Sequence, residues 1–308
     1  MSKTALITGA TGFLGSNICS YLIAKGWTVI VAKRKESDLA KLADCKSNIA
    51  HICDIEKDDL EFIFNRWHCD VVIHTAVSYG RDGQSPTEVL DSNLRFGLRI
   101  LEVAARAGCP QFVNTGSQLP RFLSAYSLSK IQFGEWGKLL SSNIQFVDLK
   151  IELMYGPKDN QKSFVSWLLH QFKSAKPEIL LTPGTQERDF VHVSDVVSAI
   201  EAVFEKRKML PAYSSIDVGS GQICEIRQFI LLARDIWEEI TREKVKAKLK
   251  FGAIQYRQGE NMKVNENLDP LYNLGWRPKI QIRDGLKALV ENIRFEYSQA
   301  AKSINDTD

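Results

Sequence analysis

The chain has 308 residues, with 40 Lys and Arg against 37 Asp and Glu, a formal net charge of +3, and 44% hydrophobic residues. A chain of this length and composition can bury a large core in one domain or two, which excludes disordered, collagen-like and disulfide-stapled proteins. So small a net charge argues against nucleic acid and against a charged membrane surface as partners.

The cysteines and the start of the chain favour a reducing compartment. The six Cys residues form no C-x-x-C pair and have no zinc-finger spacing with His, so we expect free thiols and no metal site. Residues 5–7 are apolar but lack the features of a signal peptide, and no apolar run reaches the roughly 20 residues of a membrane helix. We therefore expect a cytoplasmic protein without a membrane partner.

Apolar segments of two kinds alternate along the chain. Strands are predicted over Thr4–Thr8, residues 28–32, Val71–His74, residues 111–114 and residues 144–151, with a further short strand before Asp54. Helices are predicted over residues 13–25, 92–106, 128–140, 164–172, 195–204 and 226–237. This alternation predicts an α/β fold, a Rossmann-type doubly wound parallel sheet with a smaller C-terminal substrate-binding lobe.

The rhythm breaks after Gly156-Pro157, and this break sets the predicted domains. Residues 1–155 plus 190–218 are predicted to form the nucleotide-binding domain. Residues 156–189 plus 219–298 are predicted to form the smaller lobe, and residues 299–308 a flexible tail.

A glycine-rich turn follows the first predicted strand and opens the first predicted helix. It reads Gly9-Ala10-Thr11-Gly12-Phe13-Leu14-Gly15, a G-x-x-G-x-x-G pattern. Gly9 permits a tight turn, Gly12 lets backbone N–H groups approach a pyrophosphate at the helix N-terminus, and Gly15 lets helix and sheet pack closely. The alternative is a turn chosen only for its backbone angles. The order of strand, turn and helix favours dinucleotide binding.

The end of the second predicted strand bears on the choice of cofactor. An NAD enzyme usually places a carboxylate there to accept a hydrogen bond from the ribose 2′-hydroxyl. This strand instead runs into Lys33 and Arg34. Two cations suit a 2′-phosphate, which Arg can bind bidentately, so NADP is predicted. The alternative is a solvated basic loop.

A third pattern lies in the middle of the chain. Tyr126-Ser127-Leu128-Ser129-Lys130 is a Y-x-x-x-K motif that puts Tyr126 and Lys130 on one face of a helix, and Ser117 stands upstream at a strand end. The motif alone is weak, but together with the glycine turn and Ser117 it is specific. The chain resembles, over nearly its whole length, the extended short-chain dehydrogenase/reductases, in particular their NAD-dependent epimerase/dehydratase branch that acts on nucleotide sugars.

The resemblance implies roles for these three residues. Tyr126 is the implied acid/base, Lys130 binds the nicotinamide ribose and lowers the phenol pKa, and Ser117 hydrogen-bonds the reacting oxygen. The physical chemistry agrees, because a free phenol titrates near about 10 and a neighbouring ammonium favours the phenolate. The Ser hydroxyl shares the charge that develops on the substrate oxygen.

The resemblance also implies further binding residues. Those implied for the cofactor are Thr11, Phe13 and Leu14 in the glycine turn, Asp54 and Ile55 at the adenine, Thr75, Ala76 and Val77 over the pyrophosphate, and Asn93 and Thr115. Those implied for the substrate are Tyr79, Arg81, Gln118 and Arg188, the last in an R-D-F-x-H-V-x-D signature where the Arg faces a diphosphate. His192 and Asp195 of that signature are expected to be structural.

Within the branch, the chain is similar to reductases of nucleotide-linked 4-keto-deoxyhexoses, of the CDP-paratose synthase type. This similarity implies NADPH-dependent reduction of a C4 keto group, with a CDP-4-keto-3,6-dideoxyhexose favoured, in deoxysugar biosynthesis for surface polysaccharide such as O-antigen. A dehydratase is disfavoured, because Ser117 is followed by Gln118-Leu119-Pro120 with no acid.

Two alternatives stay open. One is a nucleotide-sugar 4-epimerase with tightly bound NAD, against which Lys33 and Arg34 argue. The other is a non-catalytic NADP-binding regulator, a class that commonly loses the Tyr or Lys retained here. By analogy with the family we expect a homodimer formed through the helices at residues 92–106 and 128–140.

Overall fold

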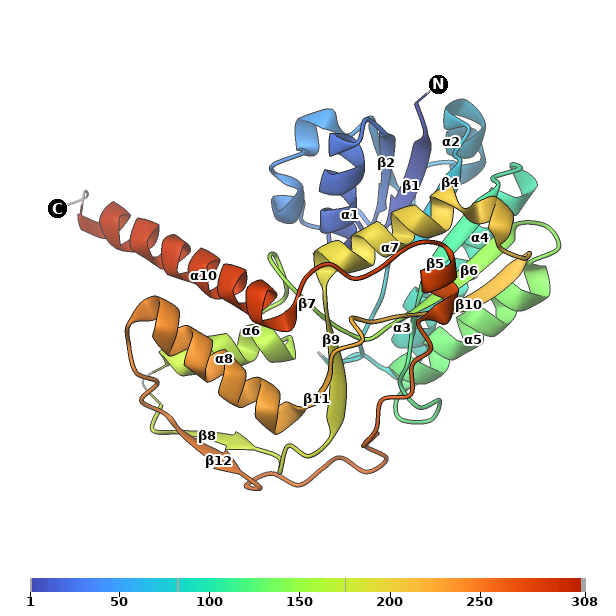
Figure 1. Ribbon diagram of the computed structural model, residues 1–308. Coiled ribbons are helices and arrows are strands. Elements are labelled where there is room, and N and C mark those ends of the chain that lie inside the picture. The colour runs from blue at the N-terminus through green and yellow to red at the C-terminus, as the bar shows by residue number, and fades with distance from the viewer. Residues whose placement is uncertain (1, 82, 175, 306–308) are drawn as a thin grey trace. The chain divides into compact units, whose positions relative to one another are not determined.

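The structure is a computed structural model and describes residues 2–81, 83–174 and 176–305. The chain divides into two compact units, which are treated separately below (Figure 1). Unit 1 consists of Met1–Glu152, Val196–Val218 and Glu266–Arg277, and unit 2 of Leu153–Asp195, Gly219–Asn265 and Pro278–Asp308.

Unit 1 is built on a seven-stranded sheet in the order β10-β6-β5-β4-β1-β2-β3, in which every pair of neighbours is parallel. The strands are β1 (Thr4–Thr8), β2 (Thr28–Lys33), β3 (His51–Asp54), β4 (Val71–His74), β5 (Gln111–Ser117), β6 (Gln145–Ile151) and β10 (Tyr213–Val218). The central residues of β1, β2, β4, β5 and β6 are buried because helices cover both faces of the sheet. The predicted Rossmann-type sheet is confirmed.

Helices of unit 1 pack on the two faces of this sheet. They are α1 (Phe13–Ala24), α2 (Leu60–Trp67), α3 (Pro86–Leu90), α4 (Phe96–Arg106), α5 (Ala125–Leu140), most of α7 (Val193–Glu205) and α9 (Asp269–Asn273), with short 3₁₀ turns η1 (Ala40–Leu42), η2 (Lys46–Asn48) and η4 (Arg207–Met209). Apolar side chains of α2, α4 and α5 share one core with the sheet. On the other face, α1 and α7 are joined by a hydrogen bond from the Tyr21 hydroxyl to Glu201 (Figure 1).

Three predicted boundaries of unit 1 differ from the structure by three residues or more. The helix expected from residue 92 begins at α3, where Ser85 and Glu88 form a capping box, and includes a π-helical turn, η3 (Asp91–Arg95). The helix expected from residue 128 begins at Ala125, because Ser124 caps it. β5 continues past the predicted residue 114 to Ser117, paired throughout with β6.

Unit 2 contains two small sheets and three larger helices. β7 (Leu153–Tyr155), β9 (Glu187–His192) and β11 (Ile223–Glu225) form one sheet, and β8 (Glu178–Leu181) pairs in parallel with β12 (Lys248–Phe251). Helices α6 (Phe164–Lys173), α8 (Ile226–Thr241) and α10 (Ile282–Asn305) share a core with these sheets. The rings of Phe190 and Phe229 stack at 3.6 Å between centroids at its centre.

The predicted domain limits differ from the two units in four places. Residues 153–155, which form β7, belong to unit 2. Residues 190–195 belong to unit 2, because β9 pairs only with β7 and β11. Residues 266–277 belong to unit 1, where Trp276 Nε1 donates to the Ser198 hydroxyl at 2.8 Å. The predicted tail is helical through Asn305 as part of α10, and residues 306–308 lie outside the described chain.

Within the described ranges, none of the helices combines the length and apolar character needed to cross a lipid bilayer.

Candidate functional site

The glycine turn between β1 and α1 is closed by its own backbone. Gly12 N donates to Gly9 O at 2.9 Å, and Gly9 has φ +67, a left-handed conformation that favours glycine. A Cβ at Gly9 would lie 2.5 Å from the backbone nitrogen of Ala76, and one at Gly15 would lie 2.3 Å from Gly9 O. Backbone from two strands and a helix therefore meets here more closely than any side chain would allow.

The N-terminus of α1 fits the pyrophosphate of a dinucleotide. Gly12 is its N-cap and has no side chain to satisfy the first N–H groups, and the first turn carries no acidic residue. Uncapped N–H groups and the helix dipole together favour an anion at this end. The turn holds the predicted residues Thr11, Phe13 and Leu14 at this point, and their contact with a cofactor stays a prediction.

The ends of β4 and β5 are fastened to their neighbours by side-chain hydroxyls. Thr75 Oγ1 donates to Thr8 O at 2.8 Å, and Thr115 Oγ1 donates to His74 O at 3.0 Å. These bonds fix the backbone that continues into Ala76 and Val77 beside the glycine turn. The segment Thr75–Val77, predicted to contact the cofactor, is therefore held at its start by a hydrogen bond to β1. The hydroxyls of Thr75 and Thr115 both donate to backbone carbonyl groups of the protein.

Asn93 lies in the π-helical turn and binds protein groups with both ends of its amide. Its Oδ1 accepts from Ser78 N at 2.7 Å, and its Nδ2 donates to Ser78 O at 2.8 Å and to the Ser129 hydroxyl at 3.0 Å. The structure thus gives Asn93 a clear task, which is to join the loop after β4 to α5. A contact with the cofactor stays a prediction.

The ends of β2 and β3 carry the residues predicted for the adenosine half of the cofactor. In the parallel register of β2 and β3, Lys33 lies opposite Asp54, and the next residue, Ile55, is buried. Lys33 is half-buried and its Nζ donates to Arg34 O at 2.8 Å and Lys35 O at 2.9 Å, whereas Arg34 is exposed. The β2 end therefore presents positive charge, as the sequence predicted.

Tyr126 and Ser117 come together at the start of α5 and the end of β5. Ser124 caps the helix, with its hydroxyl accepting from Ser127 N at 3.1 Å, and thereby fixes where Tyr126 emerges. The Ser117 side chain, whose hydroxyl accepts from Leu119 N at 3.2 Å, lies close enough to Tyr126 to lower the pKa of its phenol. The Tyr79 ring lies against Tyr126 with centroids 5.0 Å apart.

Arg81 completes this stack, with its guanidinium 4.9 Å from the centroid of the Tyr79 ring. Burial raises the pKa of Tyr126, Tyr79 raises it further, and the nearby Ser117 side chain and the Arg81 charge lower it. The sequence predicted a lowered phenol pKa. That expectation is wrong for the chain by itself, because the cost of burying a phenolate outweighs the neighbouring charges. The raised pKa favours the protonated form of the Tyr126 phenol.

Lys130 lies one turn along α5 and is almost fully buried, with 2% exposure. Burial lowers the pKa of Lys130 to about 8, and Asp148 opposes this shift. Asp148 is a buried β6 residue that the sequence did not single out, and its Oδ1 accepts from Asn114 Nδ2 at 2.7 Å. The available signal was an acidic residue between the apolar residues Val147 and Leu149 of a predicted buried strand.

A cavity of about 390 Å³ opens beside these groups. Lys130 and Asp148 line it together with Ser117 and Gln118 at the end of β5. The amide nitrogen of Gln118 is buried and makes no hydrogen bond to the described part of the chain. Ser117 thus lies on the wall of this cavity. Gln118, a predicted substrate residue, lies there too and has a buried amide nitrogen that lacks a hydrogen-bond partner among the described residues.

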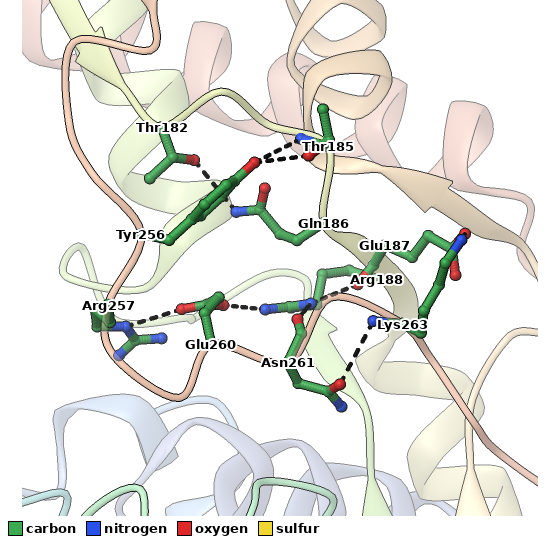
Figure 2. Close-up of polar contacts among 10 residues, drawn as sticks. All are labelled: Thr182, Thr185, Gln186, Glu187, Arg188, Tyr256, Arg257, Glu260, Asn261 and Lys263. Atoms are coloured by element: carbon green, nitrogen blue, oxygen red, sulfur yellow. Dashed lines mark hydrogen bonds and ion pairs between the residues drawn. The ribbon is translucent and has the colours of Figure 1, made fainter.

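Arg188, the residue predicted for the diphosphate, lies on β9 in unit 2. Figure 2 shows Glu260 between Arg188 and Arg257: it forms an ion pair with Arg188, and Arg257 Nε lies 3.1 Å from its second oxygen. Arg188 also donates to Asn261 O at 2.7 Å. An anionic side chain therefore already occupies the position between two guanidinium groups, and no sequence signal had marked Glu260.

The remaining signature residues are structural, as expected. Asp195 accepts from Lys279 N and Ile280 N, both at 3.0 Å, and His192 Nδ1 accepts from Ser194 N at 3.3 Å. These bonds fasten the chain after β9 within unit 2. Across the described residues, no three His, Cys, Asp or Glu side chains gather as a metal would require.

Comparisons with known proteins agree with this geometry. The model of the NAD dependent epimerase/dehydratase family matches residues 5–219. The chain is 26% identical to a CDP-abequose synthase of Salmonella typhimurium, over 95% of this chain and 99% of the relative. It is 24% identical to a putative UDP-glucose 4-epimerase of Methanocaldococcus jannaschii, over 92% and 96%.

Among solved structures, the chain is similar to UDP-glucuronic acid 4-epimerase from Bacillus cereus in complex with UDP-glucuronic acid and NAD. The TM-score is 0.80 at 22% identity, with 96% of this chain and 100% of the other covered. This similarity supports the fold.

We expect Glu260→Gln to lower the free energy of unfolding by about 1–3 kcal/mol, because it leaves two guanidinium groups without their anion where Arg188 and Glu260 are mostly buried. Urea unfolding measures the change. The matched control is Glu178→Gln, which breaks the exposed pair with Lys250 and should cost less than about 1 kcal/mol. Equal effects of the two substitutions would contradict a structural role for Glu260.

Proposed function

The chain belongs to the NAD dependent epimerase/dehydratase family, and from this premise we propose that it reduces the C4 keto group of a nucleotide-linked 4-keto-deoxyhexose with NADPH. A CDP-linked 4-keto-3,6-dideoxyhexose is the substrate class we favour, for deoxysugar biosynthesis leading to surface polysaccharide. The observation that carries the proposal is the Tyr126 phenol, whose pKa is raised by burial, close to Ser117 and one turn before buried Lys130. Similarity to a CDP-abequose synthase along 95% of the chain supports the sugar class.

The chain's own residues supply binding, orientation and a proton. The dinucleotide, when bound at the glycine turn, supplies the hydride. Ser117 holds the C4 oxygen, and Tyr126 donates its phenolic proton to that oxygen as negative charge develops on it. The raised pKa of Tyr126 suits this direction, because the phenol keeps its proton until the substrate oxygen takes it. The ammonium of Lys130 stabilises the phenolate that remains and binds the nicotinamide ribose.

The choice of NADP rests on the end of β2. Lys33 and Arg34 stand where an NAD enzyme needs a carboxylate, and Arg34 is exposed and able to meet a 2′-phosphate. The Bacillus cereus neighbour is described in complex with NAD. The positive charge of Lys33 and Arg34 is therefore the feature on which we propose NADP rather than NAD for this chain.

For the substrate we propose that Arg188 binds the diphosphate in exchange for Glu260. The ion pair with Glu260 supports an anion-binding role, since it shows that this guanidinium is disposed to meet an acidic group. Tyr79, Arg81 and Gln118 are proposed to contact the sugar. We further propose a homodimer that acts in the cytoplasm.

A 4-epimerase is the second candidate, favoured by the similarity to a putative UDP-glucose 4-epimerase. An epimerase returns its hydride and consumes no reductant, whereas the proposed reductase oxidises one NADPH per sugar. Stoichiometric NADPH oxidation with CDP-, dTDP-, UDP- and GDP-linked 4-keto sugars, followed by NMR of the product, tests the proposal. Interconversion of the two C4 epimers of a sugar nucleotide that carries a C4 hydroxyl, with no oxidation of NADPH by any of the 4-keto sugars, would overturn it.

Tyr126→Phe should lower kcat by about 10²–10⁴-fold and change KM only a few-fold, because it removes the proton donor and keeps the ring. Steady-state kinetics with a 4-keto sugar nucleotide measures both constants. Tyr213→Phe is the matched control and should keep kcat within a few-fold. Near-normal turnover of Tyr126→Phe would remove Tyr126 from the mechanism.

Arg34→Ala should raise KM for NADPH by about 10–100-fold and leave KM for NADH unchanged, because a charge-assisted contact with the 2′-phosphate is lost. Initial rates with each cofactor measure the ratio. The neighbouring Lys35→Ala is the control and should alter neither. If Arg34→Ala affects both cofactors equally, or neither, the 2′-phosphate assignment is wrong.

A further inference from the structure

Lys130 is a buried cation whose charge the proposed reaction needs. Its side chain is 2% exposed and lines the cavity beside β5 and β6. Burial lowers the pKa of Lys130 to about 8, so the ammonium stands close to losing its proton near neutral pH. Some group must hold the proton on Lys130, since a buried charge is otherwise neutralised.

Asp148 occupies a socket shaped for a carboxylate. Asn114 Nδ2 donates to its Oδ1 at 2.7 Å. A Cβ at Gly116 would lie 2.6 Å from this oxygen, and a Cβ at Gly134 would lie 2.7 Å from the other. Two glycines, one on β5 and one on α5, therefore leave the space that the carboxylate fills.

The groups on the neighbouring strands leave Asp148 as the anion that acts on Lys130. His74 on β4 is neutral, because burial and then the charge of Lys130 lower its pKa to about 3. Burial raises the pKa of Asp148, whereas Asn114, Lys130 and Lys150 lower it. Asp148 and Lys130 therefore each favour the charged form of the other.

The outer wall of the cavity carries other titratable groups. Glu135 and Lys138 on α5 are exposed, and Glu135 is paired with Arg121. Tyr213 on β10 is a neutral phenol, since burial raises its pKa. These groups line the same cavity, and Glu135 provides an exposed carboxylate to compare with the buried carboxylate of Asp148.

We propose that Asp148 is a positioning residue, whose carboxylate, held by Asn114 between Gly116 and Gly134, acts on Lys130 within the cavity that both line and keeps that side chain charged. The inference rests on the proposed function, because the charge of Lys130 matters through Tyr126 and the cofactor ribose. Asp148 acts through Lys130 and touches neither substrate nor cofactor.

The direction in which activity changes with pH follows from the role of Lys130, whose protonated side chain is the active form. Activity is present while Lys130 holds its proton and falls as the pH rises through its pKa of about 8. Removing the charge of Asp148 removes the opposing effect and lowers the pKa of Lys130 further. Activity must then fall at a lower pH.

Asp148→Asn is nearly isosteric and tests this through the pH profile of kcat/KM for NADPH oxidation. We expect the alkaline limb to move at least about one pH unit lower, with activity near the wild-type value at the acid end. Glu135→Gln is the control and should leave the limb in place. An unmoved limb, or equal loss of activity at every pH, would overturn the inference.

A second readout does not depend on the reaction. In ligand-free protein labelled with ¹³C-lysine, the Lys130 Cε resonance, assigned by its loss in Lys130→Arg, is titrated by NMR. We expect a lower midpoint in Asp148→Asn than in the wild type. An unchanged midpoint overturns the inference. A lowered midpoint in a protein that reduces no 4-keto sugar supports it and overturns the proposed function instead.

Should Asp148→Asn fail to fold, Asn114→Ala serves in the same titration. It removes the hydrogen bond that stabilises the carboxylate and leaves the carboxylate present. The Lys130 midpoint should therefore move in the same direction by a smaller amount. A midpoint equal to that of the wild type overturns the inference.

Discussion

The parallel direction of all seven strands in unit 1 is the constraint on which its candidate site depends. Carboxyl ends of parallel strands meet at one edge of a sheet, so residues far apart in the sequence are brought together there. The strands β5, β4 and β1 are neighbours in the sheet; β5 ends at Ser117, β4 ends at His74, and Gly9 follows β1. Hydrogen bonds from Thr75 and Thr115 join the ends of these strands. The site is therefore as rigid as the sheet.

The sequence was sufficient for six of the seven strands of the unit 1 sheet, for the glycine turn and for the Tyr126–Lys130 motif, because each depends on local spacing. Apolar runs bounded by turns predict strands, and glycine at a fixed position predicts a close backbone approach, which the Cβ positions at Gly9 and Gly15 confirm. The family followed from combining these signals, and a family model over residues 5–219 confirms it.

What the sequence could not predict depends on contacts between distant residues. The π-helical turn at Asp91–Arg95 has no local signature, and Asn93 is placed by bonds to Ser78 and Ser129. The direction of the Tyr126 pKa shift requires knowing how deeply the ring is buried. Glu260 was missed because its partner Arg188 is 72 residues away.

The socket around Asp148 links three positions that ordinary sequence reading treats as unrelated. Gly116 and Gly134 have no room for a methyl group only because a carboxylate lies against both. In relatives with a small apolar residue in place of Asp148, alanine should be tolerated at both glycines. Evolutionary covariation should thus join two glycines and one acid, and any transplant of this lysine environment into another scaffold would have to carry all three together.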